Sequence, residues 1–170
     1  MKKLFAIAAM LLMVIGATAQ ENKLSIKAGV GLSTVTGDIE DAKTKFAYKV
    51  GVGYEFGITE SFAIEPALMF SAKGAGELDL YYLEVPIMAV GHFNKLTVNA
   101  GPYIGYGIAG TDSYFDLEGA KRFEAGLGAG LKYNFDKFIV GVDCTYGLTS
   151  IVEDFSCKNL AFGLTLGYSF

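Results

Sequence analysis

The stretch Leu-Ala-Phe-Gly-Leu-Thr-Leu-Gly-Tyr-Ser-Phe, residues 160–170, decides the fold of this chain. Leu160, Leu164 and Phe170 belong to a series in which every second residue is bulky and apolar. The residues between them are small or polar. Because successive side chains of a strand point to opposite faces, this alternation predicts a β-strand with one apolar face.

The same two-residue period recurs along the chain. It predicts eight strands, within residues 24–33, 48–57, 62–71, 81–93, 96–106, 122–135, 138–147 and 160–170. The bulky apolar face carries no charge in any of these segments. The opposite face carries nearly all of their glycine together with nine charged residues, which are Lys27, Lys49, Glu55, Glu65, Glu84, Arg122, Glu124, Lys132 and Asp143.

The charged face must be the inner one. An eight-stranded barrel encloses a lumen only wide enough for side chains. Phe and Leu from every strand would overfill that lumen, and only lipid tolerates so much apolar surface on the outside. The sequence therefore predicts an all-β fold, an eight-stranded antiparallel up-and-down transmembrane β-barrel with a polar, glycine-rich, plugged interior.

Two alternatives to this plugged barrel are open. The interior charges could line a narrow proton or ion path instead of pairing as a plug, although an unpaired buried charge is very costly. A soluble lipocalin-like barrel would need an apolar interior and usually an N-terminal Gly-x-Trp, and the chain has no Trp.

The connections between the expected strands alternate in length. Three are tight turns, at Thr59-Glu60, Asn94-Lys95 and Asp136-Lys137, and four are longer, at residues 34–45, 72–80, 108–121 and 148–159. Outer-membrane barrels have short periplasmic turns and longer external loops. We therefore expect both termini in the periplasm of a bacterial outer membrane, with aromatic girdles at both membrane interfaces.

The N-terminal residues resemble an export signal. Lys2 and Lys3 precede an apolar run over residues 4–15, and Ala17-Thr18-Ala19 offers a cleavage site before Gln20. Residues 1–19 are expected to be a secretory signal peptide and residues 20–170 the barrel. Without the two signal lysines, the 14 basic residues fall to 12 against 18 acidic ones, and this sign argues against nucleic acid as a partner.

The segment Tyr81-Tyr82-Leu83-Glu84-Val85-Pro86-Ile87 resembles the tyrosine, hydrophobic, glutamate, hydrophobic, proline pattern of the PorT-like outer-membrane β-barrel family of Bacteroidota-type bacteria. The resemblance implies an eight-stranded barrel, and some members of that family belong to a protein secretion apparatus. Tyr168 and Phe170 resemble the C-terminal signal that the outer-membrane assembly machinery recognises. Outer-membrane lipid, lipopolysaccharide and that machinery are the expected partners; a specific protein partner is not indicated.

No catalytic, cofactor or metal site is expected. His92 is the only histidine and lies beside the turn at residues 94–95, and no serine or acid is obviously poised beside it. Residues 105–110 spell G-x-G-x-x-G, but a dinucleotide site needs a helix directly afterwards, and a polar loop follows. A lipid-modifying enzyme would need a cluster at the outer rim, where Asp79, Ser113 and Glu153 are vague candidates.

The longer loops are acidic. Binding of divalent cations is one interpretation of this excess and simple solvation is the other; the candidate contacts are Asp38, Glu40, Asp41, Asp112, Asp116 and Glu118. Cys144 and Cys157 are expected to be free thiols, because the last hairpin sets Cys144 opposite residue 162 or 163. Pro66, Pro86 and Pro102 fall within strands, where we expect a bulge or distortion.

The sequence thus predicts a barrel with a structural, assembly or surface-interaction role, with neither catalysis nor an open pore. A subunit of a secretion apparatus and an outer-membrane lipid-modifying enzyme are the alternatives.

Overall fold

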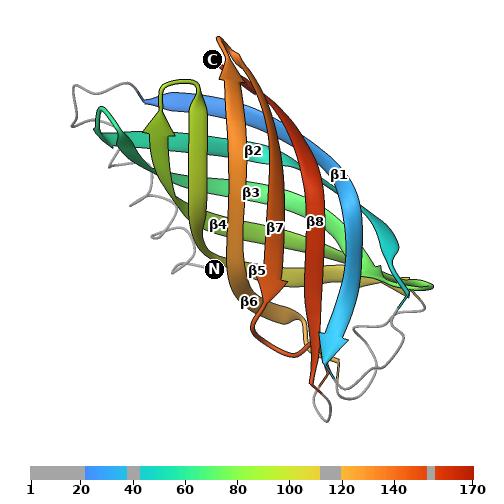
Figure 1. The fold of residues 1–170 in the computed structure, drawn as a ribbon. Coiled ribbons are helices and arrows are strands. Elements are labelled where there is room, and N and C mark those ends of the chain that lie inside the picture. Colours follow the sequence, from blue (N-terminus) through green and yellow to red (C-terminus); the bar gives the residue numbers. More distant parts are fainter. Residues whose placement is uncertain (1–21, 38–42, 112–119, 153–155) are drawn as a thin grey trace.

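The described residues of this chain form a closed barrel of eight antiparallel strands (Figure 1). The computed structural model describes residues 22–37, 43–111, 120–152 and 156–170. Each strand pairs with the next in sequence, and the first pairs with the last. The strands are β1 (Lys23–Gly37), β2 (Lys45–Thr59), β3 (Phe62–Ala75), β4 (Leu78–Phe93), β5 (Leu96–Gly110), β6 (Phe123–Phe135), β7 (Phe138–Gly147) and β8 (Cys157–Ser169).

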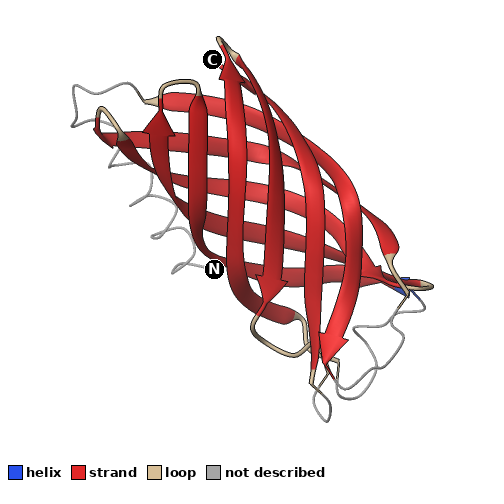
Figure 2. Ribbon diagram, in the orientation of Figure 1, coloured by secondary structure: helices blue, strands red, loops and turns tan. Residues whose placement is uncertain are grey.

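Almost all of the described chain is strand (Figure 2), and this confirms the fold class predicted from the two-residue period. Among the described residues, no helix combines the length and the hydropathy needed to cross a membrane.

The two ends of the barrel differ in their connections. At one end, which we call the turn end, residues 60–61, 94–95 and 136–137 join successive strands, and Lys23 and Ser169 lie at the same end. Asn94 and Asp136 have φ of 61° and 57°, the left-handed conformation that tight hairpins need and that Asn and Asp tolerate. The turn predicted at residues 59–60 is shifted by one residue, because the register of β2 against β3 slips between Gly57 and Thr59.

At the opposite end, the loop end, one connection differs from the prediction. The expected loop over residues 72–80 is a two-residue turn at 76–77, because β3 and β4 remain paired as far as Ala75 and Leu78. Gly76 makes this turn possible, since its φ of 57° lies in the left-handed region. The small and charged residues that suggest a loop therefore extend the hairpin, and they carry Lys73 into the wall of the barrel.

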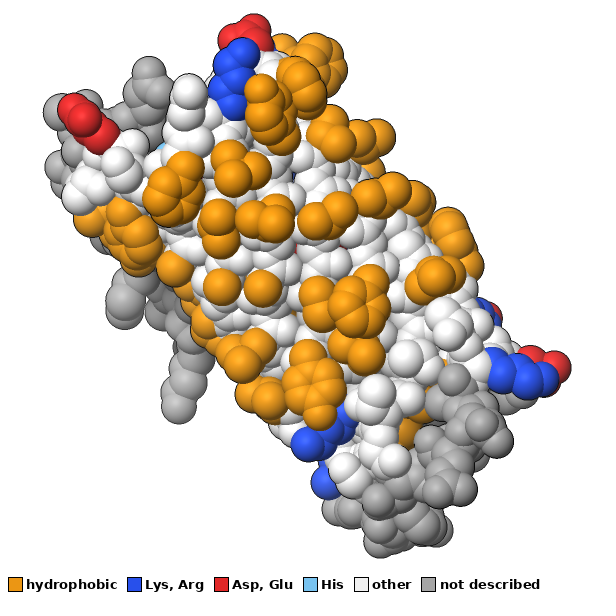
Figure 3. Space-filling view, viewed as in Figure 1, with side chains coloured by type: hydrophobic (Ala, Val, Ile, Leu, Met, Phe, Trp, Pro, Cys, Tyr) orange, Lys and Arg blue, Asp and Glu red, His pale blue; other side chains and the backbone are white. Residues whose placement is uncertain are grey.

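The apolar side chains point away from the barrel axis. Phe162, Leu164 and Leu166 are between 56% and 62% exposed, and Val142 is 50% exposed. Hydrophobic side chains form rows across the outer wall of the barrel (Figure 3). The predicted inside-out arrangement is confirmed, and the soluble lipocalin-like alternative is wrong because the large apolar residues do not fill the interior.

The three prolines interrupt the strand ladders without shifting them. Near each proline, two neighbouring strands lack residue pairing over a short stretch, and the register is the same on both sides of each gap. In β2–β3 the gap lies between the pairs Gly53:Ala67 and Phe56:Ile64. In β3–β4 it lies between Pro66:Ile87 and Met69:Glu84, and in β4–β5 between Pro86:Tyr103 and Ala89:Ala100. Because proline has no N–H to donate, a local gap is the expected cost. The expected distortion is present, but a bulge is not: the register shifts lie elsewhere, between Gly57 and Thr59 and between Tyr81 and Tyr82.

Both cysteines are free thiols, as predicted. Cys144 lies opposite Phe162 in the β7–β8 ladder, whereas Cys157 lies opposite Gly37 in the β1–β8 ladder. The hairpin register therefore keeps the two sulfur atoms at different levels of the barrel.

Candidate functional site in the barrel lumen

The inward-facing polar residues form successive layers along the lumen, from the loop end to the turn end. Each layer draws its side chains from strands that are distant in sequence. The lumen is the candidate functional site because it concentrates the charges that the alternating strands direct inward.

The first layer below the loop end is a cluster around Lys73. Lys73 Nζ lies 2.7 Å from Glu84 Oε1 and 2.8 Å from Glu124 Oε1, and it is also 4.7 Å from the centre of the Tyr82 ring. Glu124 accepts further hydrogen bonds from the Tyr103 hydroxyl at 2.5 Å and from Asn159 Nδ2 at 2.7 Å. One ammonium is thus paired with two carboxylates, which hydrogen bonds hold in a dry environment; we call these residues the loop-end cluster.

An apolar cap covers the loop-end cluster. Its five buried residues are Val35, Leu80, Tyr82, Ile151 and Cys157, which come from β1, β4, the β7–β8 connection and β8. Ile151 is held there through its backbone, which donates to the Cys157 carbonyl and accepts from the Lys121 N–H. Leu80, Tyr82 and Ile151 are at most 2% exposed, so among the described residues an apolar layer separates the loop-end cluster from solvent.

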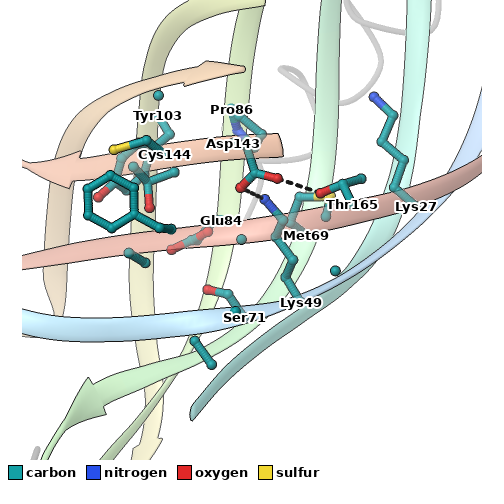
Figure 4. Close-up of a pocket in the computed structure, with 18 of the residues that line it drawn as sticks. Lys27, Lys49, Met69, Ser71, Glu84, Pro86, Tyr103, Asp143, Cys144 and Thr165 are labelled. Atoms are coloured by element: carbon teal, nitrogen blue, oxygen red, sulfur yellow. Dashed lines mark hydrogen bonds and ion pairs between the residues drawn. The ribbon is translucent and has the colours of Figure 1, made fainter. Parts of the chain in front are cut away.

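Below the loop-end cluster lies an inner cavity of about 120 Å³, crossed by the ion pair between Lys49 and Asp143 (Figure 4). Asp143 also accepts a 2.5 Å hydrogen bond from Thr165 on the neighbouring strand. Ser71 Oγ and Asn99 Oδ1 are buried at this cavity without a hydrogen-bond partner in the structure. Buried polar atoms of this kind normally bind ordered water, and the cavity has room for it.

The next layer is a septum of three residues, Lys27, Glu65 and Lys132. Lys27 pairs with Glu65 Oε1, and Lys132 Nζ lies 3.1 Å from Glu65 Oε2. All three residues line both the inner cavity and the cavity at the turn end, so they separate the two. Gly53 permits this packing, because a Cβ at that position would lie 2.5 Å from Glu65 Oε1 and 3.3 Å from Lys27 Nζ.

The turn-end cavity has a volume of about 440 Å³ and a polar lining. In its wall, His92 Nε2 lies 3.0 Å from Glu55 Oε1, and His92 Nδ1 lies 3.3 Å from the Thr97 hydroxyl. The expectation that no acid lies next to His92 is therefore wrong: β2 and β5 bring Glu55 and Thr97 to it from 37 and five residues away.

The hydrogen bonds from Glu55 to His92 to Thr97 resemble those that activate a nucleophilic hydroxyl, but the Thr97 hydroxyl is not accessible to a substrate. Thr97 is only 3% exposed, and its hydroxyl oxygen already accepts a 2.7 Å hydrogen bond from Asn134 Nδ2. A nucleophile needs room for the reacting carbon within about 3.5 Å. The four side chains therefore act as a polar brace across β2, β4, β5 and β6.

Eight of the nine predicted interior charges lie in these layers. Arg122 is different: it precedes β6, is half-buried, and donates from Nη1 to the Gly107 carbonyl at 3.4 Å. Sequence reasoning missed Lys73, because residues 72–80 were interpreted as a loop. The inward series Ala63, Glu65, Met69, Ser71 continues directly to Lys73, so the two-residue period was the signal that could have found it.

The other predicted residues lie outside the lumen. Tyr168 packs edge-on against Phe138 and Phe170, and the Phe170 N–H donates to the Leu24 carbonyl at the closure of the barrel. The G-x-G-x-x-G sequence of residues 105–110 is part of β5. The acidic candidates Asp38, Glu40, Asp41, Asp112, Asp116 and Glu118 lie outside the described residues, as do Ser113 and Glu153.

Within the parts of the chain that the structure describes, no group of three or more His, Cys, Asp and Glu side chains is placed to hold a metal ion. The chemistry that the layers support is charge pairing and hydrogen bonding, with open volume at the turn end.

Comparison with known proteins agrees with this geometry. A family model described as "Outer membrane protein beta-barrel domain" matches residues 5–170. No curated protein sequence matches the chain. Ail of Yersinia pestis, solved in complex with the heparin analogue sucrose octasulfate, is similar at 22% identity and a TM-score of 0.56, over 89% of this chain and 100% of that one.

Two further solved structures show the same fold. Neisserial surface protein A is similar at 11% identity and a TM-score of 0.61, over 89% of this chain and 100% of that one. Ail of Yersinia pestis in a phospholipid bilayer nanodisc is similar at 19% identity and a TM-score of 0.52, over 88% of this chain and 100% of that one.

Proposed function

Since the chain belongs to the family of outer membrane protein β-barrel domains, we propose that it is a non-catalytic barrel of the bacterial outer membrane that acts in surface structure or surface interaction. The observation that carries this proposal is the inside-out distribution of side chains. Bulky apolar residues cover the outer wall, and the charged residues pair with one another inside.

The lumen supports a role without transport. The apolar cap closes the loop end, and the septum of Lys27, Glu65 and Lys132 separates the two cavities. A continuous water column would need both barriers to open. In planar bilayers the purified protein is therefore expected to show no steady conductance, and a stable open channel would contradict the proposal.

We propose that the turn end faces the periplasm and the loop end faces outward. Three connections at the turn end have only two residues, as periplasmic turns of outer-membrane barrels do, and three connections at the loop end are longer. A cysteine introduced at Glu77, in the β3–β4 connection of the loop end, should react with a membrane-impermeant maleimide on intact cells. A cysteine introduced at Lys95 should react only after the outer membrane is permeabilised, and the reverse pattern would overturn this orientation.

The loop end is the proposed site of surface interaction, with lipopolysaccharide as the first ligand class to test. Its acidic loops could bind the sugar-phosphate layer through divalent cations, and the Ail structure contains a sulfated sugar. The test replaces Asp38, Glu40, Asp41, Asp112, Asp116 and Glu118 by Asn or Gln and measures binding to lipopolysaccharide vesicles with and without Mg²⁺. Loss of the Mg²⁺-dependent part of binding, with normal heat-modifiable migration in gels, would support the proposal; unchanged binding would remove the acidic loops from it.

The finer assignments rest on sequence resemblance. We propose assembly by the outer-membrane assembly machinery through Tyr168 and Phe170, which lie at the closing strand and its end. Membership of the PorT-like subfamily rests on the segment 81–87, whose Glu84 belongs to the loop-end cluster. A secretion-apparatus subunit would co-purify with a defined periplasmic or membrane protein, and purification of the barrel alone from mildly solubilised membranes would argue against that role.

A further inference from the structure

We propose that the turn-end cavity is a binding site for a small anion, whose carboxylate or phosphate group bridges the ammonium groups of Lys27 and Lys132. The site is distinct from the loop-end surface, because the layers of the lumen separate the two. The inference therefore does not depend on the proposed surface interaction.

The charge composition of the septum favours an anion. Lys27 and Lys132 share one carboxylate, and each of its two oxygens is paired with one lysine. An ammonium group has three N–H donors, so both lysines keep donor capacity beyond their bond to Glu65. The side chains are 9% and 12% exposed, and in so dry a place a second anion would interact far more strongly than at an open surface.

Among the described residues, the other carboxylates that line this cavity do not form ion pairs with Lys27 or Lys132. Glu55 is in contact with His92 at 3.0 Å and belongs to the polar brace, and it acts on Lys27 and Lys132 only at longer range. Asp136 lies in an exposed turn at the mouth of the cavity, where Lys23 and Lys137 add positive charge to the lining. Counted over the lining side chains, four lysines face three carboxylates, which are Glu55, Glu65 and Asp136.

The cavity has the size and the hydrogen-bonding groups of a small-molecule site. Its volume of about 440 Å³ falls within the range of roughly 300–1,000 Å³ that is usual for ligand pockets. The Ser25 hydroxyl lies beside the septum, 3.5 Å from Glu65, and Asn134 lines the wall. Because the septum closes the inner side, a ligand would enter from the turn end and stop at Lys27 and Lys132.

The test is calorimetric titration of the whole barrel, refolded in lipid nanodiscs, with sodium phosphate and separately with sodium succinate. Sodium chloride keeps the ionic strength constant and serves as the non-specific anion. The proposal expects saturable binding at one site of phosphate, of succinate or of both, and the stronger of the two identifies the anionic group.

Lys132→Met removes one ammonium group and leaves Lys27 paired with Glu65. It should weaken binding by about tenfold or more, since a hydrogen bond to a charged group contributes about 1.5–3 kcal/mol. Lys49→Met is the matched control, because Lys49 is also a lumen lysine but lines only the inner cavity. It should bind like the wild type, and Lys132→Arg should retain most of the affinity.

Heat-modifiable gel migration checks that each variant is folded. Two results would overturn the proposal: wild-type protein that shows no saturable binding of either anion, or Lys132→Met and Lys49→Met variants that bind equally well. If Lys132→Met does not fold, Ser25→Ala and Lys27→Met replace it in the titration, and affinities unchanged from the wild type would overturn the proposal in the same way.

Discussion

The two halves of the lumen use the same types of side chain in opposite proportions. In the loop-end cluster one lysine lies between two glutamates, whereas in the septum two lysines share one glutamate. The first is sealed under an apolar cap, and the second faces a polar cavity. Two layers of one lumen can therefore carry opposite charge imbalances, and a layer's solvent access decides what its imbalance does.

The largest effect is expected from Lys73→Met. The substitution leaves Glu84 and Glu124 buried without their common cation, and breaking a buried ion pair from one side costs about 3–5 kcal/mol. Urea unfolding in lipid vesicles measures the loss of unfolding free energy. Lys49→Met is the control from the more open part of the lumen, where the side chain is 25% exposed. If both variants lose the same unfolding free energy, burial under the apolar cap does not make the loop-end ion pairs more costly to break.

A smaller loss is expected from Ile151→Ala. Removing a buried Ile side chain from the apolar cap leaves a cavity, and such truncations cost about 2–5 kcal/mol, here toward the lower end because the residue lies in a connection that can relax. Leu148→Ala, at a residue 50% exposed in the same connection, should change stability far less. The same urea titration compares the two, and a similar small loss in both would mean that the cap is not a packed core.

Gly53→Ala tests the close packing of the septum. The new methyl group would lie 2.5 Å from Glu65 Oε1, so the septum must shift, and overpacking of this kind costs about 1–3 kcal/mol. Gly91→Ala is the control, because its nearest neighbour is the movable Phe93 ring at 3.3 Å. If Gly53→Ala also weakens anion binding, the packing of the septum determines the geometry of the turn-end cavity. If Gly53→Ala is as stable as Gly91→Ala, the septum side chains can move to accept the methyl group without loss of stability.

The smallest effect is expected from Glu55→Gln. The amide keeps the shape and one acceptor of the polar brace, and the His92 and Glu55 side chains are partly solvated, so the loss should be about 1 kcal/mol or less. Glu60→Gln, at an exposed turn residue, sets the baseline. A loss as large as that of Lys73→Met would mean that the turn-end half is as tightly coupled as the loop-end half.

Most of the fold was predictable because strand alternation is a local property. Residues 160–170 already show which side chains share a face, and the small lumen of an eight-stranded barrel then decides which face is inside. The β3–β4 hairpin was the exception. The glycine and charged residues there are typical of a loop. However, β3 and β4 remain paired as far as Ala75 and Leu78, and the local sequence does not show this pairing.

The candidate site was predictable as a set of residues but not as a set of contacts. The alternation places Lys49 and Asp143 on the inner face, yet they are 94 residues apart, and nothing in either segment names the other as its partner. His92 shows the same limit, because its acid and its hydroxyl come from two other strands. The division of the lumen into a sealed half and an open half is likewise invisible in the sequence.

The sequence by itself predicted a barrel with its apolar residues outward, because the two-residue period defines the two faces of each strand and the bulk of the side chains favours the apolar face outside. Only the tertiary structure decided which charges meet, since the register and tilt of the closed sheet set the level at which each inward side chain lies. As a result, Lys73 pairs with two carboxylates beneath the apolar cap, and Glu65 pairs with two lysines at the edge of the turn-end cavity.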